Sequence, residues 1–593
     1  MLKKLLKVNI LDFVVISWFM FVAYCWVISY FEIFTLDTIK LFVYPSLLVF
    51  ILLLLTKLKG FKFHKFSFNS YKTQLLSDPE QFLPSLITTV LVTVIVLFQL
   101  FAILKLPPTN WDSMTYHLPK ITLALQNNSM ILPSNIPITR IISSPWNSEI
   151  SNLAFYSIFN NDIVVELPQL LSAIGILLLM RRYFNKKQDW LMLAILSVPL
   201  FVSQMITTQN DLLLYFLALY SFITLEEAFK NPSINKFVLF IIGGALLVGT
   251  KVNGLPILGV ITLVLTIHYI YNTIKNKGKI ISIEKGKLSR NIFVIGILLI
   301  LAIIVAFPSY YYSKKVYDNY LYQPPETASK FKIGIPTIKE NIIHFGYKII
   351  KPQQHTNDIY NQDTGHLGNV FIFVLLLSFI AFIASKRFRK EILTNSLFQV
   401  AVLSFLVFIT IHSPDLWDLR LVLFPLLTIF ILLLYYLSQS NTFLKNILVG
   451  VVVLGSLTNI IAWAWFISPN IINTLKKYNY SIADFVSDSR FSLYSLNEDS
   501  DFRTQVSKSL IILGSEDTWI YPYFNVNNSN LNKIYFSKDY KESNYDYVVL
   551  DKYLLNKPDL RSEILACNTL LGEDIYTIIY KRDLNKCNRD LIK

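Results

Sequence analysis

Long stretches of apolar residues, separated by short basic segments, run through the first 468 positions of the chain. Each stretch is close to the roughly 20 residues that an α-helix needs to cross a bilayer. The pattern therefore predicts a polytopic α-helical membrane protein. We expect thirteen spans, at 10–31, 40–56, 84–105, 163–180, 189–206, 211–229, 236–251, 254–272, 292–311, 369–385, 391–411, 421–438 and 446–468.

Composition supports this interpretation, because only 16% of the 593 residues are charged and 53% are hydrophobic, whereas a soluble protein carries about 25% charged residues. The three lysines within Met1–Val8 precede an apolar stretch, as in a signal peptide. That stretch is too long for a signal peptide and no cleavage pattern follows it, so we expect a retained first helix. Of the three cysteines, Cys25 lies in the first span, and Cys567 and Cys587 would pair only in an oxidising compartment.

The formal net charge is +15, and most of the excess lies in the segments between spans rather than in a nucleic-acid-binding patch. Placing the N-terminus in the cytoplasm puts every basic cluster on the cytoplasmic side, as the positive-inside rule requires. These clusters follow the second, fourth, eighth and tenth spans, within 57–72, 181–187, 275–290 and 386–390.

The remaining segments then fall on the outer face. Two of them are long loops, at 107–162 and 312–368, and 148–161 within the first loop is predicted to be a re-entrant or interfacial helix. We divide the chain into a transmembrane domain at 1–468 and an extracytoplasmic domain at 469–593. Three strand-like runs, Ser509–Gly514, Tyr547–Leu550 and Ile575–Tyr580, predict a small α/β domain with a parallel or mixed sheet. This domain lacks GxGxxG, so no nucleotide is assigned to it.

The first outer loop carries the densest chemistry, in the segment Asn110–Pro119. Asp112 is the candidate acid there, although Asn110 or Asp112 would also serve as an ordinary helix cap. Tyr116 is either a ligand contact or a residue of the interfacial aromatic belt, and His117 is either functional or structural. Arg140 and Glu149, farther along the loop, are the other chemically capable side chains.

Three more candidates lie at outer ends of spans. Asp211 begins a span, where a carboxylate also complements the helix dipole. Lys251 follows the glycine-rich run Gly243–Thr250 and departs from the positive-inside pattern; snorkelling to the interface is the alternative. Arg420 opens a later span and suits an anionic partner, either a nearby aspartate or a phosphate.

The order of these motifs resembles the GT-C glycosyltransferases that use polyprenyl-phosphate sugars, in the bacterial protein O-mannosyltransferase and aminoarabinose-transferase group. The resemblance covers about residues 84–440. It rests on Trp111–His117 in the first outer loop, Asn210–Leu214, the run ending at Lys251, and Arg420 five positions before Pro425. Many members have a paired acid where this chain has Asp112 followed by Ser113, so the second acid of the pair is missing here.

The resemblance implies a transferase that moves a sugar from a polyprenyl-phosphate donor to a glycan, lipid or protein acceptor, with inversion, at a bacterial plasma membrane. It implies Asp112 as the base for the acceptor, with Asp211 or Glu149 as its partner acid. Cations must meet the departing phosphate, and Lys251 and Arg420 are the candidates, with Lys314, Lys315 or a divalent metal as substitutes. We assign substrate binding to Tyr116, His117, Arg140, Lys251 and Arg420.

The second outer loop is interpreted as a lid or an acceptor surface, and its His355, Asp358, Asp363 and His366 have only superficial metal-ligand spacing. A transporter or flippase of lipid-linked saccharides is the alternative function, and it should place charged groups near the bilayer midplane. A ligase of lipid-linked glycans is a near neighbour of the transferase. The sugar, the acceptor, the carrier length, metal use and the oligomeric state are not set by the sequence.

Overall fold

The computed structural model describes the chain in segments that cover most of its first 477 residues and five strands beyond them. They are 9–60, 79–105, 108, 110, 112–134, 136, 138–184, 188–231, 233–275, 285–320, 335–350, 367–411, 418–477, 508–512, 533–536, 546–551, 568–573 and 577–582. Cys567 and Cys587, whose pairing the sequence left open, and the loop residues His355, Asp358, Asp363 and His366 lie outside these segments.

Seven helices in the described segments are long and apolar enough to cross a membrane, and the number rises to nine if each of two bent helix pairs forms one span. The multi-pass helical architecture is therefore confirmed, whereas the count of thirteen spans is not. The seven are α2 (Ile10–Tyr30), α3 (Leu36–Gly60), α5 (Pro79–Lys105), α9 (Leu167–Phe184), α12 (Asp211–Lys230), α14 (Gly254–Lys275) and α24 (Thr442–Lys477).

The two bent pairs are α15 (Lys285–Ala306) with α16 (Pro308–Tyr317), bent by 46°, and α19 (Asn369–Ala384) with α20 (Lys386–Leu393), bent by 112°. Pro308 is the first residue of α16; a proline is tolerated there because it has no N–H to donate. Shorter apolar helices complete the set: α13 (Ile234–Thr250), α21 (Ser396–Ile411) and α23 (Leu423–Ser438).

The span expected at 189–206 is not one helix. The structure breaks it into α10 (Leu191–Leu196), α11 (Pro199–Ser203) and the 3-10 turn η3 (Gln204–Ile206). The cause is Pro199, since proline disfavours helical geometry in the residue before it, and Val198 is accordingly extended, with φ −94° and ψ 111°. The side chains of this broken segment are almost all buried within the bundle.

Helix α12 lies at the centre of the bundle, where it packs against α9, α13, α14 and α23. It is apolar on all sides, as expected for a helix enclosed by others, and its side chains from Asp211 to Leu225 are all buried. Because its first residue is Asp211, the centre of the bundle fixes the position of one candidate acid.

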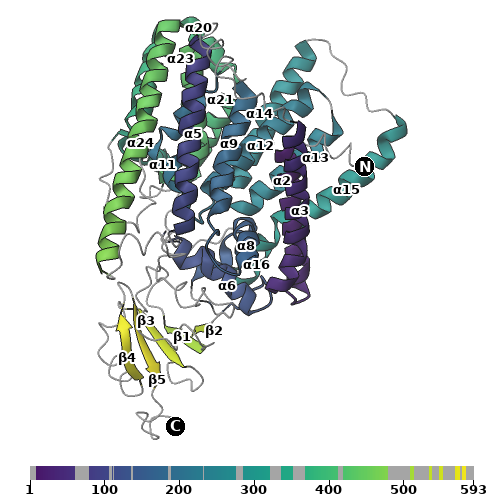
Figure 1. Ribbon diagram of the computed structural model, residues 1–593. Helices are drawn as coiled ribbons and strands as arrows, with labels where there is room; N and C mark the ends of the chain where they lie inside the picture. Colours follow the sequence, from purple (N-terminus) through teal and green to yellow (C-terminus); the bar gives the residue numbers. More distant parts are fainter. Residues whose placement is uncertain are drawn as a thin grey trace.

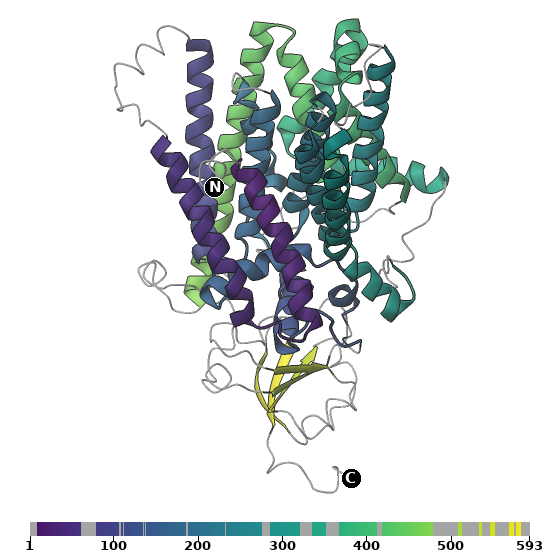
Figure 2. The same cartoon turned by 90° about the vertical axis from the view of Figure 1, so that its right-hand side faces the viewer.

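The segment between α5 and α9 forms a cap of short helices on one end of the bundle (Figure 1). These are the π-helix η1 (Ser113–His117), α6 (Leu118–Gln126), α7 (Thr139–Ser143) and α8 (Asn147–Phe159), and α8 corresponds to the short helix expected at 148–161. Helix α16 and the strands lie at this same end, whereas α20, with its basic residues, lies at the opposite end (Figure 1). The turned view again shows the strands beyond this one end of the helix bundle (Figure 2). Which end faces the cytoplasm stays a prediction.

The remaining helices are α18 (Ile335–Ile350), within the second expected loop, and α22 (Asp418–Leu421), the single turn that carries Arg420. Helix α24 continues to Lys477, nine residues beyond the boundary expected at 468. Along the described residues that follow, the chain forms only strands.

The C-terminal strands form a five-stranded mixed sheet in the order β2-β1-β3-β5-β4. Strand β1 pairs in parallel with β2 and β3, and β5 pairs antiparallel with β3 and β4. The expected mixed sheet is thus confirmed, and β2 and β4 are the strands that the sequence pattern missed. The strands are β1 (Lys508–Ile512), β2 (Lys533–Phe536), β3 (Tyr547–Asp551), β4 (Asn568–Glu573) and β5 (Thr577–Arg582).

Candidate functional site

Asp112 stands at the start of the π-helical turn η1 and does not cap it. The capping bond comes from Asn110, whose Oδ1 accepts from the backbone N–H of Ser113 at 3.3 Å. Asp112 has helical backbone angles, so its side chain projects from the turn instead of folding back over it. Of the two caps that the sequence left open, the structure therefore uses Asn110 and leaves the Asp112 carboxylate for other contacts.

The Asp112 carboxylate is held by cations from distant parts of the chain. Its Oδ2 lies 2.8 Å from Nη1 of Arg420, and its Oδ1 lies 3.5 Å from Nη1 of Arg140. The side-chain amide of Gln209 also donates to Oδ2, at 3.4 Å. Burial alone would raise the pKa of Asp112, but the two guanidinium groups outweigh it and lower the pKa to about 2. The group is therefore ionised in this arrangement.

Asp211, at the start of α12, is the second buried carboxylate. Its Oδ1 accepts from Nζ of Lys251 at 2.5 Å, and its Oδ2 lies 3.5 Å from Nε of Arg420. Lys251 follows the last residue of α13 and is only 17% exposed, so it is directed into the site and does not snorkel away from it. Burial lowers the pKa of Lys251, and Asp211 opposes that effect.

Hydrogen bonds fix these helix ends relative to one another. Nδ2 of Asn210 donates to the Thr250 carbonyl at 3.2 Å, which joins the start of α12 to the end of α13. The hydroxyl of Thr208 donates to Oγ of Ser113 at 2.7 Å, which joins the segment before α12 to η1. Ser113, which stands where many members of the resembled group have a second acid, thus ties together the segments that carry Asp112 and Asp211.

The five charged groups alternate in sign in the order Lys251, Asp211, Arg420, Asp112, Arg140. Three cations face two carboxylates, so the set carries one surplus positive charge. The two acids and Arg420 are at most 9% exposed, whereas the side chains at the two ends are 17% and 27% exposed. The accessible edge of the array is therefore cationic, which suits an anionic ligand with several acceptor oxygens.

Glu149 does not join this array. Its Oε1 lies 2.8 Å from Nδ1 of His117, and its Oε2 accepts from the Ser148 hydroxyl at 2.6 Å. Both members of the pair are fully enclosed, at 1% and 0% side-chain exposure. Burial would raise the pKa of Glu149, but the charge of Lys120 and the bonds from His117 and Ser148 lower it to about 2. The partner of Asp112 is therefore Asp211, through Arg420, and Glu149 instead holds the His117 ring.

Tyr116 supports the exposed end of the array. The guanidinium of Arg140 lies 4.9 Å from the centre of its ring, a cation–π distance. The neighbouring His117 ring lies 4.2 Å from the Tyr116 ring, centre to centre. Burial, followed by the charge of Asp112, raises the pKa of Tyr116 well above its ordinary value. Tyr116 is thus a neutral support for Arg140 and not a base.

Two residues of this region escaped the sequence prediction. Gln209 links the acid-bearing segments, because its Nε2 also donates to Oδ1 of Asn110 at 2.9 Å. Lys120 is fully buried and donates to the carbonyls of Ser144 and Pro145 at 2.6 and 3.2 Å. Burial lowers the pKa of Lys120 to about 8. The sequence could have pointed to both residues: Gln209 lies two positions before Asp211, and Lys120 lies three positions after His117.

The described residues hold no group of three or more His, Cys, Asp and Glu side chains able to bind a metal ion. Asp112 and Asp211 are each bound to cations, and Glu149 is bound to His117 and Ser148. In the described part of the chain these three carboxylates are thus already engaged by cations or hydrogen-bond donors.

Fold and site together define a multi-pass membrane protein with a buried, cation-edged polar site at one end of its helix bundle. The fold is similar to that of ArnT from Cupriavidus metallidurans, both in the apo state and bound to undecaprenyl phosphate. The two comparisons give TM-scores of 0.47 and 0.48 and identities of 11% and 10%, and each covers 84% of this chain and 98% of the other. No family model matches the sequence, and no curated protein matches it.

At these identities and TM-scores the likeness concerns the arrangement of the helices and says nothing of activity, substrate or site residues. The charged array of the chain itself carries the function proposed next.

Proposed function

We propose that the chain is an integral membrane glycosyltransferase that moves a sugar from a polyprenyl-phosphate donor to an acceptor on the extracytoplasmic face. The observation that carries the proposal is the alternating array of Asp112, Asp211, Arg420, Lys251 and Arg140, with its cationic edge at the ends of apolar helices. A lipid phosphate in the adjoining leaflet would present its anionic oxygens at that height. The N-terminus is proposed to be cytoplasmic, and the C-terminal domain extracytoplasmic.

In the reaction, an acceptor hydroxyl attacks the anomeric carbon of the donor sugar. Its oxygen forms the new bond, the bond between the sugar and the phosphate oxygen breaks, and the electron pair leaves with the phosphate. Asp112 receives the hydroxyl proton, a role that typically contributes about 10²–10⁴-fold. Arg420 and Lys251 meet the charge that develops on the departing phosphate. Displacement in one step inverts the anomeric configuration.

The pairing of Asp112 with Arg420 explains why the donor would have to bind before Asp112 accepts a proton. A carboxylate with a pKa of about 2 is a weak base. A donor phosphate competes for the Arg420 guanidinium, because both anions accept from the same planar N–H groups. Drawing Arg420 away from Asp112 raises the pKa of that carboxyl. Asp112 therefore becomes a competent base only when a donor is bound.

The position of the array at the ends of helices favours this proposal over a transporter. A transporter of charged substrates places its binding groups near the bilayer midplane, often in broken helices. Here Asp211 is the first residue of α12, Lys251 follows the last residue of α13, and Arg420 precedes α23. A ligase of lipid-linked glycans would share this chemistry and differ in the size of the donor glycan.

A binding experiment tests the anion site directly. The purified protein in lipid nanodiscs is titrated with undecaprenyl phosphate and, in parallel, with undecaprenol, which lacks the phosphate. We expect the phosphate form to bind at least tenfold more tightly, and Arg420→Gln to remove most of that difference. Equal affinity for the two lipids would contradict the proposal, because it would mean that the array does not bind phosphate.

A further inference from the structure

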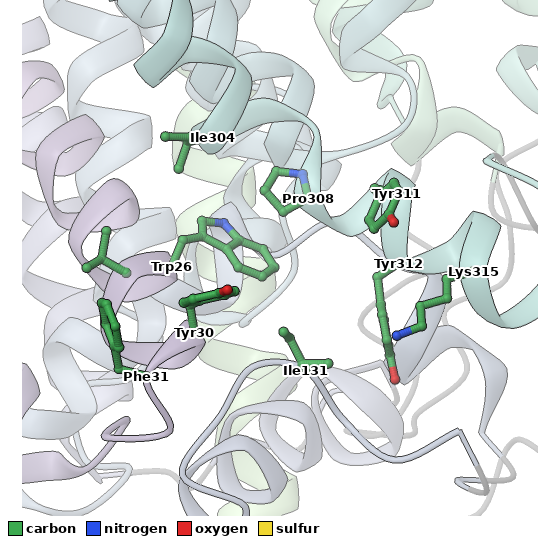
Figure 3. A pocket seen from close by; sticks show the side chains of 10 residues that line it. Trp26, Tyr30, Phe31, Ile131, Ile304, Pro308, Tyr311, Tyr312 and Lys315 are labelled. Atoms are coloured by element: carbon green, nitrogen blue, oxygen red, sulfur yellow. The ribbon is translucent and has the colours of Figure 1, made fainter.

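A hollow at the surface of the bundle is lined by none of the residues of the charged array. It has a volume of about 460 Å³ and lies between the end of α2, residue Ile131 and the junction of α15 and α16 (Figure 3). Aromatic and apolar side chains dominate its lining, chiefly Trp26, Tyr30, Ile304, Pro308, Tyr311 and Tyr312. We call it the α2–α16 groove.

The groove lies where apolar spans end. Helix α2 ends at Tyr30, and the apolar part of α15 ends at Ala306, immediately before the bend into α16. Tryptophan and tyrosine gather at the boundary between hydrocarbon and water, because their rings are apolar and their polar atoms reach water. We therefore infer that the groove lies at this boundary, with its lining residues Val27 and Ile304 toward the hydrocarbon.

One cation stands at the polar end of the groove. Lys315 is exposed, and in the part of the chain that the structure describes it has no ion pair and no hydrogen bond. Its ammonium group lies beside the Tyr312 ring at the edge of the groove (Figure 3). The neighbouring Lys314 differs, because its Nζ donates to the Asp318 carboxylate at 2.6 Å. Among the described residues that line the groove there is no acid, and Lys315 is the charged one.

Helix α16 separates this cation from the charged array. On the side of α16 that faces the bundle, Tyr310 and Ser313 are buried, and Oη of Tyr310 donates to the Val248 carbonyl at 2.8 Å. That carbonyl lies three residues before Lys251. Tyr311 and Lys315 lie on the side turned toward the groove and are exposed. A lipid phosphate held by Lys315 would thus be on the other side of α16 from Lys251.

Tyr312 holds α16, which forms one wall of the groove, in place. Its hydroxyl donates to the Leu132 carbonyl, in the segment between α6 and α7. This bond holds α16 against the cap of short helices, so the groove is formed before any ligand arrives. A preformed apolar cleft beside a cation can bind the acyl chains and the headgroup of one lipid together, without the cost of ordering the site first.

We propose that the α2–α16 groove binds a membrane phospholipid with an anionic phosphate headgroup. Its acyl chains lie against Trp26, Val27 and Ile304, and its phosphate lies at Lys315. The apolar lining suits the acyl chains, and the positive charge of Lys315 suits the negative charge of the headgroup. The site is separate from the sugar-transfer site, and the proposal holds whether or not the chain is a transferase.

Trp26 supplies the probe for the test, because bromine on an acyl chain quenches the fluorescence of an adjacent indole. The full chain is placed in nanodiscs of phosphatidylcholine that contain increasing amounts of dibrominated phosphatidylglycerol. In the reference series the brominated lipid is phosphatidylcholine and the phosphatidylglycerol carries no bromine. The Trp26 signal is the difference between the wild type and Trp26→Phe, since the chain has 9 tryptophans. We expect the brominated anionic lipid to quench Trp26 at about fivefold lower mole fraction than the brominated neutral lipid, a ratio that one lysine near an anionic lipid supports.

Two lysine variants make the result specific. Lys315→Ala should abolish the preference for phosphatidylglycerol, and Lys314→Ala, one residue away, should retain it. Native mass spectrometry of retained phosphatidylglycerol in the same two variants gives the answer if Trp26→Phe does not fold. The proposal is overturned if both lipids quench equally or if the two lysine variants behave alike. It is also overturned if added undecaprenyl phosphate restores the fluorescence, because the groove would then belong to the donor.

Discussion

Arg420 Nη1 lies 2.8 Å from Oδ2 of Asp112, and Nε of the same guanidinium lies 3.5 Å from Oδ2 of Asp211. One cation therefore joins two acids that are 99 positions apart in the sequence and is itself more than 200 positions from either. Because all three side chains are at most 10% exposed, water does little to screen their interaction. The state of any one of them depends on the other two.

Asp112→Asn should lower the rate of sugar transfer by about 10²–10⁴-fold, because an amide cannot accept the acceptor proton. Affinity for undecaprenyl phosphate should stay the same or rise, since the variant releases Arg420 from its countercharge. Transfer is measured with a radiolabelled donor, and binding is measured on the same preparation.

Asp189→Asn is the matched control for this variant. Asp189 is also a buried acid paired with an arginine, Arg181, at 3.0 Å, but it is not part of the array. Its transfer rate should stay near that of the wild type. Wild-type turnover by Asp112→Asn would remove Asp112 from the mechanism.

Arg420→Ala should destabilise the fold by about 3–5 kcal/mol, because removing one partner of a buried ion pair leaves the other charge uncompensated. Asp112→Asn in the same chain should recover part of that loss, since it removes the charge that was left unpaired. The interaction free energy from the full double-mutant cycle should be about 0.5–3 kcal/mol. Unfolding in detergent is followed for the four chains. Simple additivity of the two substitutions would mean that Arg420 and Asp112 are not coupled.

Lys251→Ala should weaken the binding of undecaprenyl phosphate by about 10–100-fold, which corresponds to the loss of one hydrogen bond to a charged group. Undecaprenol should bind Lys251→Ala and the wild type equally. Lys275→Ala, in the last turn of α14, is the control cation outside the array and should leave the affinity unchanged. An unchanged affinity in Lys251→Ala would place the phosphate elsewhere.

The sequence predicted the class of fold because burial in a bilayer leaves a strong one-dimensional signal. Runs such as those of α2 and α12 have no other simple explanation in a chain of this composition. The same signal cannot separate a continuous helix from a broken one, which is why the segment at 189–206 was expected to be one helix. Pro199 could have indicated the break, but the prediction gave more weight to the length of the apolar run.

The candidate site was predicted as a set of residues and not as a set of contacts. Asp112, Asp211, Lys251 and Arg420 all lie in one array, because each stands at the end of a span on the same side of the bundle. Their pairing depends on how α12, α13 and α23 pack, which periodicity does not encode. Glu149 was accordingly grouped with Asp112, whereas the structure pairs it with His117.

The Glu149–His117 pair predicts a loss of stability in acid. Glu149 has an ordinary pKa of 4.5 and a pKa of about 2 in the fold, so the folded state binds protons less readily than the unfolded state. Its contribution is therefore fully present above about pH 4.5 and is lost as the pH falls through about 2. The loss should be on the order of a few kcal/mol.

Thermal unfolding between pH 5 and pH 3 measures this effect, at pH values spaced closely enough to give a slope. Glu149→Gln keeps a hydrogen-bond acceptor for His117 but removes the titrating group, so its midpoint should fall less steeply than that of the wild type. Some slope should remain, because Asp112 also titrates with a pKa of about 2. Parallel curves for the two proteins would show that Glu149 does not titrate as described.

Gly249→Ala tests how closely α13 must approach its neighbours for Lys251 to reach the array. A Cβ at this position would lie 2.2 Å from Nδ2 of Asn147 and 2.7 Å from the carbonyl oxygen of Val305. The second atom belongs to the backbone, so the clash cannot be relieved by a side-chain rotation, and overpacking of this kind costs about 1–3 kcal/mol. Displacing the end of α13 should also weaken undecaprenyl phosphate binding.

Gly259→Ala, where a Cβ meets nothing within 4 Å, should instead be neutral or stabilising by about 1 kcal/mol, as for any alanine that replaces a helical glycine. Equal thermal midpoints for the two variants would mean that the close approach at Gly249 does not position Lys251.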